Sequence, residues 1–317
     1  MMLLISTGLG QSAAPTGIES RIEHGKVRRS FRIHVPSAVA ESDRKVPLVI
    51  CLHGGGSDAA AISKSGWTPL ADRESFIAVY PEGLNGRWND GRTVQKYIQQ
   101  DAVTDDVDFI IQLLEQLIVD YPVDPSRVYL LGLSNGGFMT QRLANEHTGK
   151  FGAVAVQIAS LPTAYLTGAL KFSPQSPLSV LFMCGTEDLF MPYEGGKLTP
   201  NFTPKLVSSK TFDFGQDSAI PVVDAVDLWV KHNRLDSSAP HITKLPDKDP
   251  HDDCHVIHHH WKSEGSSTSV ELYEIVGGGH TIPGGAQYLP ERIIGRVCHD
   301  INGIEATWKF FETKKRE

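Results

Sequence analysis

The stretch GLSNG, at residues 132–136 of this 317-residue sequence, contains a serine flanked by glycines. Such a serine could act as a catalytic nucleophile. A serine hydroxyl is a weak nucleophile until a neighbouring base removes its proton. The G-x-S-x-G pattern by itself is also that of an ordinary turn. Ser134 therefore becomes a candidate nucleophile only if the chain supplies a histidine and an acid that orients it.

Later apolar runs end on side chains that could complete such a site. Glu187 and Asp188 follow SVLFMCG, and His280 follows VELYEIV and three glycines. Serine, acid and histidine in this chain order, each after a strand, are typical of α/β-hydrolases. Glu187 and Asp188 are adjacent and cannot both point at one imidazole, and their positions alone leave the choice open. The pattern predicts that His280 is the base for Ser134.

The run HGGG at residues 53–56 ends an earlier apolar segment and could stabilise negative charge. Its glycine amides, Gly54 and Gly55, and the amide of Asn135 are candidate donors to an oxyanion. One such donor typically contributes about 2.7–4 kcal/mol to the stability of the transition state. A plain turn and a phosphate-binding loop are the alternative interpretations of these glycines.

The elements that must position these residues follow from hydrophobic patterning. Apolar runs that stop on Gly, Pro or polar residues indicate strands buried on both faces, at 46–56, 76–83, 127–134, 151–160 and 179–188. Alternation predicts a strand at 27–35, and the segments 255–263 and 269–276 are expected to pair. Helical spacing predicts helices near 107–118, 135–147, 221–233 and 304–311. Strands that alternate with helices predict an α/β fold with a mostly parallel sheet and helices on both faces.

The chain is expected to form a single catalytic domain over residues 25–317. Residues 189–220 lack periodicity and predict a lid insertion, and residues 235–253 are expected to be a polar linker. The apolar start, residues 1–24, is interpreted as a possible remnant of a secretory signal, which predicts a secreted or periplasmic protein. The net charge of −7 argues against a nucleic-acid surface. No apolar run is long enough for a membrane span.

Three further features have competing interpretations. Trp88, in the stretch RWNDGR, either lines the substrate cleft or is a buried structural residue. The histidines between 251 and 260, together with Cys254, suggest a metal site, but the spacing supplies no tetrahedral set. We therefore expect surface or packing histidines and no metal or other cofactor. Whether Cys254 pairs with Cys298 is left open by the sequence.

Several stretches resemble one known family. LHGGGS, AVYPEGLNGRWNDGR, VDPSRVYLLGLSNGGFMTQRLA, CGTED, MPYEGG and GGGHTIPGG are similar to the polyhydroxybutyrate (PHB) depolymerase and feruloyl esterase-like serine esterases, over about residues 25–313. The resemblance implies an α/β-hydrolase fold and extracellular or periplasmic ester hydrolysis without a metal. It implies Ser134 as nucleophile, Asp188 as acid and His280 as base. The HGG glycines and Asn135 would form the oxyanion hole.

Ile282 stands where the family commonly has Trp, which implies a smaller and less aromatic pocket wall. With His53 and Trp88, it is predicted to contact substrate. The predicted function is therefore hydrolysis of a carboxylic ester through an acyl-enzyme, with a hydroxyalkanoate, hydroxycinnamoyl or acyl-sugar ester as substrate. A peptidase or thioesterase on the same fold, and a non-catalytic binding protein, are the alternatives.

Overall fold

The computed structural model describes residues 18–92, 105–198 and 218–316. Most of the segment interpreted as a signal remnant and most of the predicted lid lie outside the described residues. Within the described residues, no helix is long and apolar enough to cross a membrane.

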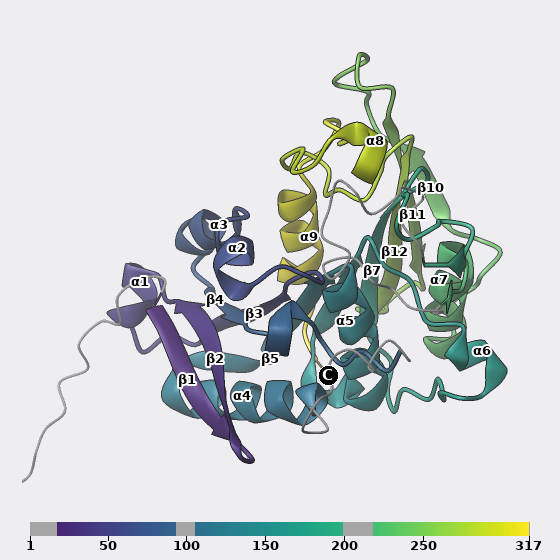
Figure 1. The fold of residues 1–317 in the computed structure, drawn as a ribbon. Coiled ribbons are helices and arrows are strands. Elements are labelled where there is room, and N and C mark those ends of the chain that lie inside the picture. Colours follow the sequence, from purple (N-terminus) through teal and green to yellow (C-terminus); the bar gives the residue numbers. More distant parts are fainter. Residues whose placement is uncertain (1–17, 93–104, 199–217, 317) are drawn as a thin grey trace, which may run out of the picture.

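Ten strands form one twisted sheet in the order β1-β2-β4-β3-β5-β6-β7-β12-β11-β10 (Figure 1). The six central strands, from β4 to β12 in this order, run parallel, and an antiparallel pair continues the sheet at each end. The strands are β1 (Ile18–His24), β2 (Val27–His34), β3 (Val46–Leu52), β4 (Ile77–Pro81), β5 (Val123–Leu133), β6 (Ala153–Gln157), β7 (Ser179–Gly185), β10 (His241–Lys244), β11 (His255–Lys262) and β12 (Ser269–Val276). A separate pair joins β8 (Gly196–Lys197) to β9 (Ser218–Ala219).

Helices cover both faces of the sheet, as the sequence predicts. They are α1 (Ser37–Ala40), α2 (Ala59–Ser63), α3 (Trp67–Glu74), α4 (Asp106–Asp120), α5 (Asn135–Glu146), α6 (Ala164–Thr167), α7 (Val222–His232), α8 (Glu291–Ile294) and α9 (Gly303–Glu312). The longer helices α4, α5 and α7 contribute to one core, and α3 and α9 contribute to the other. The predicted α/β architecture is confirmed.

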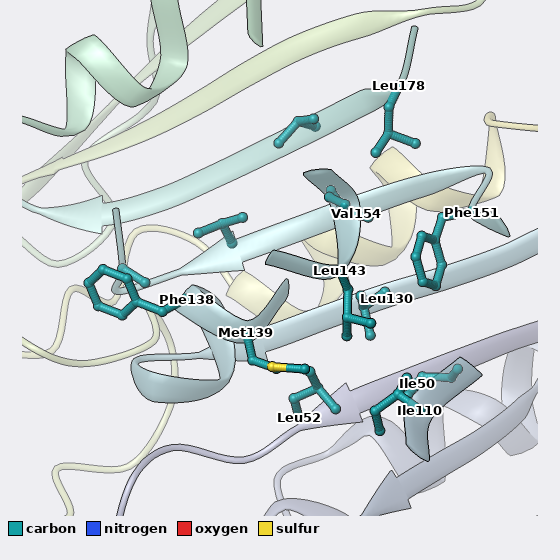
Figure 2. Close-up of a cluster of buried hydrophobic side chains, with 14 of the residues drawn as sticks. Ile50, Leu52, Ile110, Leu130, Phe138, Met139, Leu143, Phe151, Val154 and Leu178 are labelled. Carbon is teal, nitrogen blue, oxygen red and sulfur yellow. The ribbon is translucent and has the colours of Figure 1, made fainter. Parts of the chain in front are cut away.

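Alternation along the central strands assigns side chains to the two cores. Ile50 and Leu130 point into the core that contains the α4 and α5 residues, and Figure 2 shows Ile50 beside Ile110 of α4 and Leu130 beside Leu143 of α5. Their neighbours Val49 and Leu131 point to the opposite face, in the core that contains the α9 residues. A strand with apolar side chains on both faces loses all contact with water, which explains the continuous apolar runs.

Two edge strands lie where the sequence predicted none. Strand β1 pairs with β2 from Ile18↔Ile33 to His24↔Val27, so the sheet begins inside the segment 1–24. Strand β10 pairs with β11 within the predicted polar linker. Strand β1 alternates between half-buried and exposed residues, and β10 is largely exposed. Backbone pairing with a neighbour holds them, so their side chains carry little hydrophobic pattern.

Candidate active site

Ser134 occupies a strained turn between β5 and α5. Its backbone has φ 53° and ψ −117°, a conformation that costs a non-glycine residue about 1–3 kcal/mol. The amide of Ser134 donates to the carbonyl of Gln157 at the end of β6, with an N–O distance of 2.9 Å. This bond fixes the turn at the carboxyl edge of the sheet. The predicted strand–turn–helix context of a nucleophile elbow is therefore present.

The glycines that flank Ser134 permit close backbone approach. A Cβ added at Gly132 would lie 2.0 Å from the carbonyl oxygen of Gly136. A Cβ added at Gly136 would lie 2.4 Å from the carbonyl oxygen of Leu52 at the end of β3. The turn packs directly on a neighbouring strand, and only residues without a side chain fit.

We expect Gly136→Ala to destabilise the protein by about 3 kcal/mol, the upper end for overpacking, because the clashing atoms belong to backbone. Gly149→Ala is the matched control, since a Cβ there meets nothing within 4 Å. The free energy of unfolding in urea measures both. Equal stability of the two variants would contradict the close packing of the turn.

His280 and Asp188 form a buried pair. Asp188 follows β7, His280 follows β12, and Nδ1 of His280 lies 2.6 Å from Oδ2 of Asp188. The other oxygen of Asp188, Oδ1, accepts from the amides of Phe190 and Met191, each at 2.8 Å. Three donors therefore surround the carboxylate, which has a side-chain exposure of 0%. These contacts fix the direction in which the carboxylate points.

Glu187 points away from this pair. Its side chain is 63% exposed, and its carboxylate lies 4.0 Å from the guanidinium of Arg296. Of the two adjacent acids, the structure brings Asp188 to the histidine. The sequence pattern alone leaves that choice open.

The backbone and ring of His280 are also held. The His280 amide donates to the carbonyl of Ile294, and the hydroxyl of Tyr288 donates to the His280 carbonyl at 2.9 Å. The ring of Phe190 meets the imidazole edge-to-face, with centroids 5.2 Å apart.

Within the described residues, the Ser134 hydroxyl makes no hydrogen bond. In free enzymes the bond between nucleophile and base is often long and shortens only when substrate binds.

The predicted oxyanion donors lie beside the elbow. A Cβ added at Gly54 would be 3.6 Å from Cβ of Ser134, and one added at Gly55 would be 3.4 Å from Cβ of Asn135. Among the described residues, none accepts a hydrogen bond from the backbone amides of Gly54 or Gly55. The amide of Asn135 opens helix α5, where the helix dipole favours negative charge. That these three amides bind an oxyanion stays a prediction.

The prediction that His53 contacts substrate is corrected by the structure. Its side chain has 0% exposure, and its Nδ1 donates to the carbonyl of Gly54 at 2.8 Å. Its Nε2 accepts from the amide of Gly83 at 3.0 Å. Burial lowers the pKa of the His53 imidazole, which favours the neutral ring that these two bonds require. His53 thus supports the glycine loop from inside.

For Trp88, the structure supports the buried alternative. The side chain is 1% exposed, and its indole Nε1 donates to the carbonyl of His53 at 2.9 Å. The indole is therefore not a wall of the substrate cleft. Ile282 is half-buried near the start of α9, where a Cβ added at Gly303 would lie 2.8 Å from its Cγ2. Contact of Ile282 with substrate stays a prediction.

The histidines of β11 pair with carboxylates on β12. His258 contacts Glu271, and His259 contacts Glu274 on the opposite face of the sheet, each at 2.9 Å. In the part of the chain that the structure describes, no group of three or more His, Cys, Asp or Glu side chains is arranged to hold a metal ion. All four cysteines are buried free thiols, so Cys254 is not bonded to Cys298.

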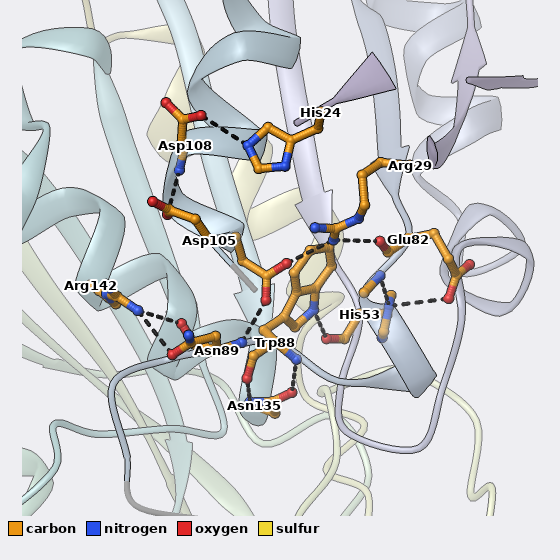
Figure 3. A network of polar contacts seen from close by, with 12 residues as sticks. His24, Arg29, His53, Glu82, Trp88, Asn89, Asp105, Asp108, Asn135 and Arg142 are labelled. Carbon is orange, nitrogen blue, oxygen red and sulfur yellow. Dashed lines mark hydrogen bonds and ion pairs between the residues drawn. The ribbon is translucent and has the colours of Figure 1, made fainter. Parts of the chain in front are cut away.

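A buried polar network lies behind the nucleophile elbow (Figure 3). The sequence did not predict it. The side chain of Asn135 accepts a hydrogen bond from the backbone amide of Trp88 and donates one to its carbonyl. The carboxylate of Asp106 accepts from the amide of Asn89 and from the guanidinium of Arg29, each at 2.7 Å. The sequence signal for this network is the stretch RWNDGR, which supplies Trp88 and Asn89.

The elbow after β5 and an acid and a histidine after later parallel strands are features of the α/β-hydrolases, and this protein is a serine hydrolase of that class. An acetyl xylan esterase from Aspergillus awamori has the same fold, with a TM-score of 0.59 and 14% identity. The match covers 94% of this chain and 100% of that one.

Comparison of sequences narrows the class. The family model described as esterase PHB depolymerase matches residues 29–163. The putative esterase NocK of Nocardia uniformis subsp. tsuyamanensis is 26% identical over 292 residues, which cover 89% of this chain and 78% of NocK. The poly(3-hydroxyalkanoate) depolymerase C of Paucimonas lemoignei is 28% identical over 261 residues, 79% of this chain and 58% of that enzyme. The chain is similar to PHB depolymerases over residues 29–163, and it is a serine carboxylic ester hydrolase.

Proposed function

We propose that this protein hydrolyses carboxylic esters through an acyl-enzyme on Ser134. The observation that carries the proposal is the buried Asp188–His280 pair at 2.6 Å, which lies at the same edge of the sheet as the strained Ser134. The Nδ1 proton of His280 points to Asp188, so Nε2 is free to accept a proton from the serine hydroxyl.

In the proposed reaction, Oγ of Ser134 attacks the ester carbon while His280 takes the hydroxyl proton. The carbonyl oxygen becomes an oxyanion and accepts hydrogen bonds from the amides of Gly54, Gly55 and Asn135. His280 then gives its proton to the departing alcohol as the bond between carbon and alkoxy oxygen breaks. Water attacks the acyl-enzyme with His280 again as base, which releases the acid and restores Ser134.

The proposed substrates are hydroxyalkanoate, hydroxycinnamoyl or acyl-sugar esters. The name of poly(3-hydroxyalkanoate) depolymerase C supports a hydroxyalkanoate ester, and that of feruloyl esterase B of Neurospora crassa, 28% identical over 176 residues, supports a hydroxycinnamoyl ester. Polymeric esters of this kind are too large to cross a membrane. We therefore propose that the protein acts outside the cytoplasm.

A fluorophosphonate probe tests the function directly. An activated serine attacks phosphorus and displaces fluoride, so we expect one label on the peptide that contains Ser134 and none after heat denaturation. Activity on an aryl acetate should survive EDTA. A folded protein that takes no label and hydrolyses no ester would be a binding protein, and a label on another serine would move the nucleophile.

A further inference from the structure

The two candidate oxyanion amides of the glycine loop are aimed by side chains that bind the neighbouring carbonyls. A trans peptide holds its C=O and N–H in one plane and in opposite directions. The Trp88 indole donates to the carbonyl of His53, whose peptide partner is the N–H of Gly54. The His53 ring donates to the carbonyl of Gly54, whose peptide partner is the N–H of Gly55. Each amide is therefore directed by a bond on the far side of its own peptide.

Asn135 connects this loop to the third amide. Its Oδ1 accepts from the amide of Trp88 at 2.8 Å, and its Nδ2 donates to the carbonyl of Trp88 at 3.1 Å. The same Nδ2 also donates to Asp90 at 2.6 Å. Asn135, whose own amide is the third candidate donor, thus holds the backbone of Trp88, whose indole directs the Gly54 amide (Figure 3).

We propose that Asn135, Trp88 and His53 form a brace that sets the mutual position of the three oxyanion donors. This inference rests on the proposed acyl-enzyme function. The side chains of the brace are positioning groups, because they are buried and act through backbone amides. Donors that are held in place before the reaction stabilise the charge that develops in the transition state more than they stabilise the bound ester.

The matched variants are Trp88→Phe and Trp229→Phe. Both indoles are buried, at 1% and 0% exposure, and each Nε1 makes one hydrogen bond, at 2.9 Å to the His53 carbonyl and at 2.8 Å to Gln141. Both changes keep an aromatic ring and remove one donor. Only Trp88 contacts the oxyanion loop, so Trp229→Phe reports the cost of losing a buried indole bond elsewhere.

We expect Trp88→Phe to lower kcat on an aryl acetate about 100-fold, the effect of misplacing a reacting group by roughly 1 Å. KM should change little, since the bound ester carries no oxyanion charge. Affinity for an aryl trifluoromethyl ketone should fall by the same factor as kcat, because Ser134 adds to its carbonyl carbon and forms an oxyanion. The midpoint of the pH–kcat/KM profile should not move, since the brace does not touch Asp188 or His280.

The proposal is overturned if Trp88→Phe loses no more kcat than Trp229→Phe, or if ketone affinity stays at the wild-type value. Asn135→Ala keeps the backbone amide and removes only the side chain, and the same measurements on it decide the matter if Trp88→Phe does not fold. If the wild type is labelled normally by the fluorophosphonate and the variants keep the wild-type kcat, the brace is refuted but the proposed function is not. Absence of labelling in the wild type refutes the proposed function.

Discussion

Replacing Ser134 by alanine is expected to lower kcat for ester hydrolysis about 10⁶-fold, the loss seen when the nucleophile of a serine protease is removed. Without Oγ no acyl-enzyme can form, and only the oxyanion donors and the binding site remain. The fold should persist, because alanine fits any space that serine occupies. Stopped assays on an aryl acetate at high enzyme concentration, with circular dichroism of the same sample, measure both quantities.

Ser75→Ala is the control for backbone strain. Ser75 also has a positive φ, 59°, at the end of α3, and it is not a residue of the proposed site. A serine-to-alanine change at such a φ therefore occurs in both variants, but only one removes the nucleophile. A Ser134→Ala enzyme with activity within about tenfold of wild type, about 1.4 kcal/mol of barrier, would exclude Ser134 as the nucleophile.

Asp188→Asn is expected to lower kcat about 10⁴-fold, as replacement of the orienting acid does in serine proteases. The structure gives the reason. The amides of Phe190 and Met191 both need the oxygen that now occupies the Oδ1 position, so the new NH₂ group must face Nδ1 of His280. Nδ1 would then accept a hydrogen bond, the proton would move to Nε2, and His280 could not take the proton of Ser134.

Glu187→Gln is the control for this change, because it removes a charge from the adjacent, exposed side chain. Its kcat should stay close to that of wild type, within the small effect of an exposed charge. Steady-state kinetics of the two variants on one ester measure the contrast. The reverse ranking would make Glu187 the orienting acid.

The central architecture could be predicted from the sequence. Strands such as β3 and β7 are buried on both faces, so their apolar runs are continuous and unmistakable without any knowledge of their neighbours. The elbow is equally local, because Gly132 and Gly136 are needed within one turn of Ser134. Order along the chain then predicts which later strands contribute the acid and the histidine, since parallel strands present their carboxyl ends at one edge.

The family resemblance implied Asp188 and His280, but the local pattern left the acid open, and only the tertiary structure shows these two side chains in contact. Asp188 and His280 are 92 residues apart, and the choice between Asp188 and Glu187 depends on the direction that the chain takes after β7. The edge strands β1 and β10 are held by backbone pairing, which leaves little mark on side-chain pattern. His53 and Trp88 have residue types that suit a substrate pocket, and only the packing of the 53–55 and 84–90 loops shows that they lie beneath it. Local residue spacing determines where strands and turns form. Which side chains are buried, and which form hydrogen bonds with one another, depends on contacts between distant segments that no local pattern encodes.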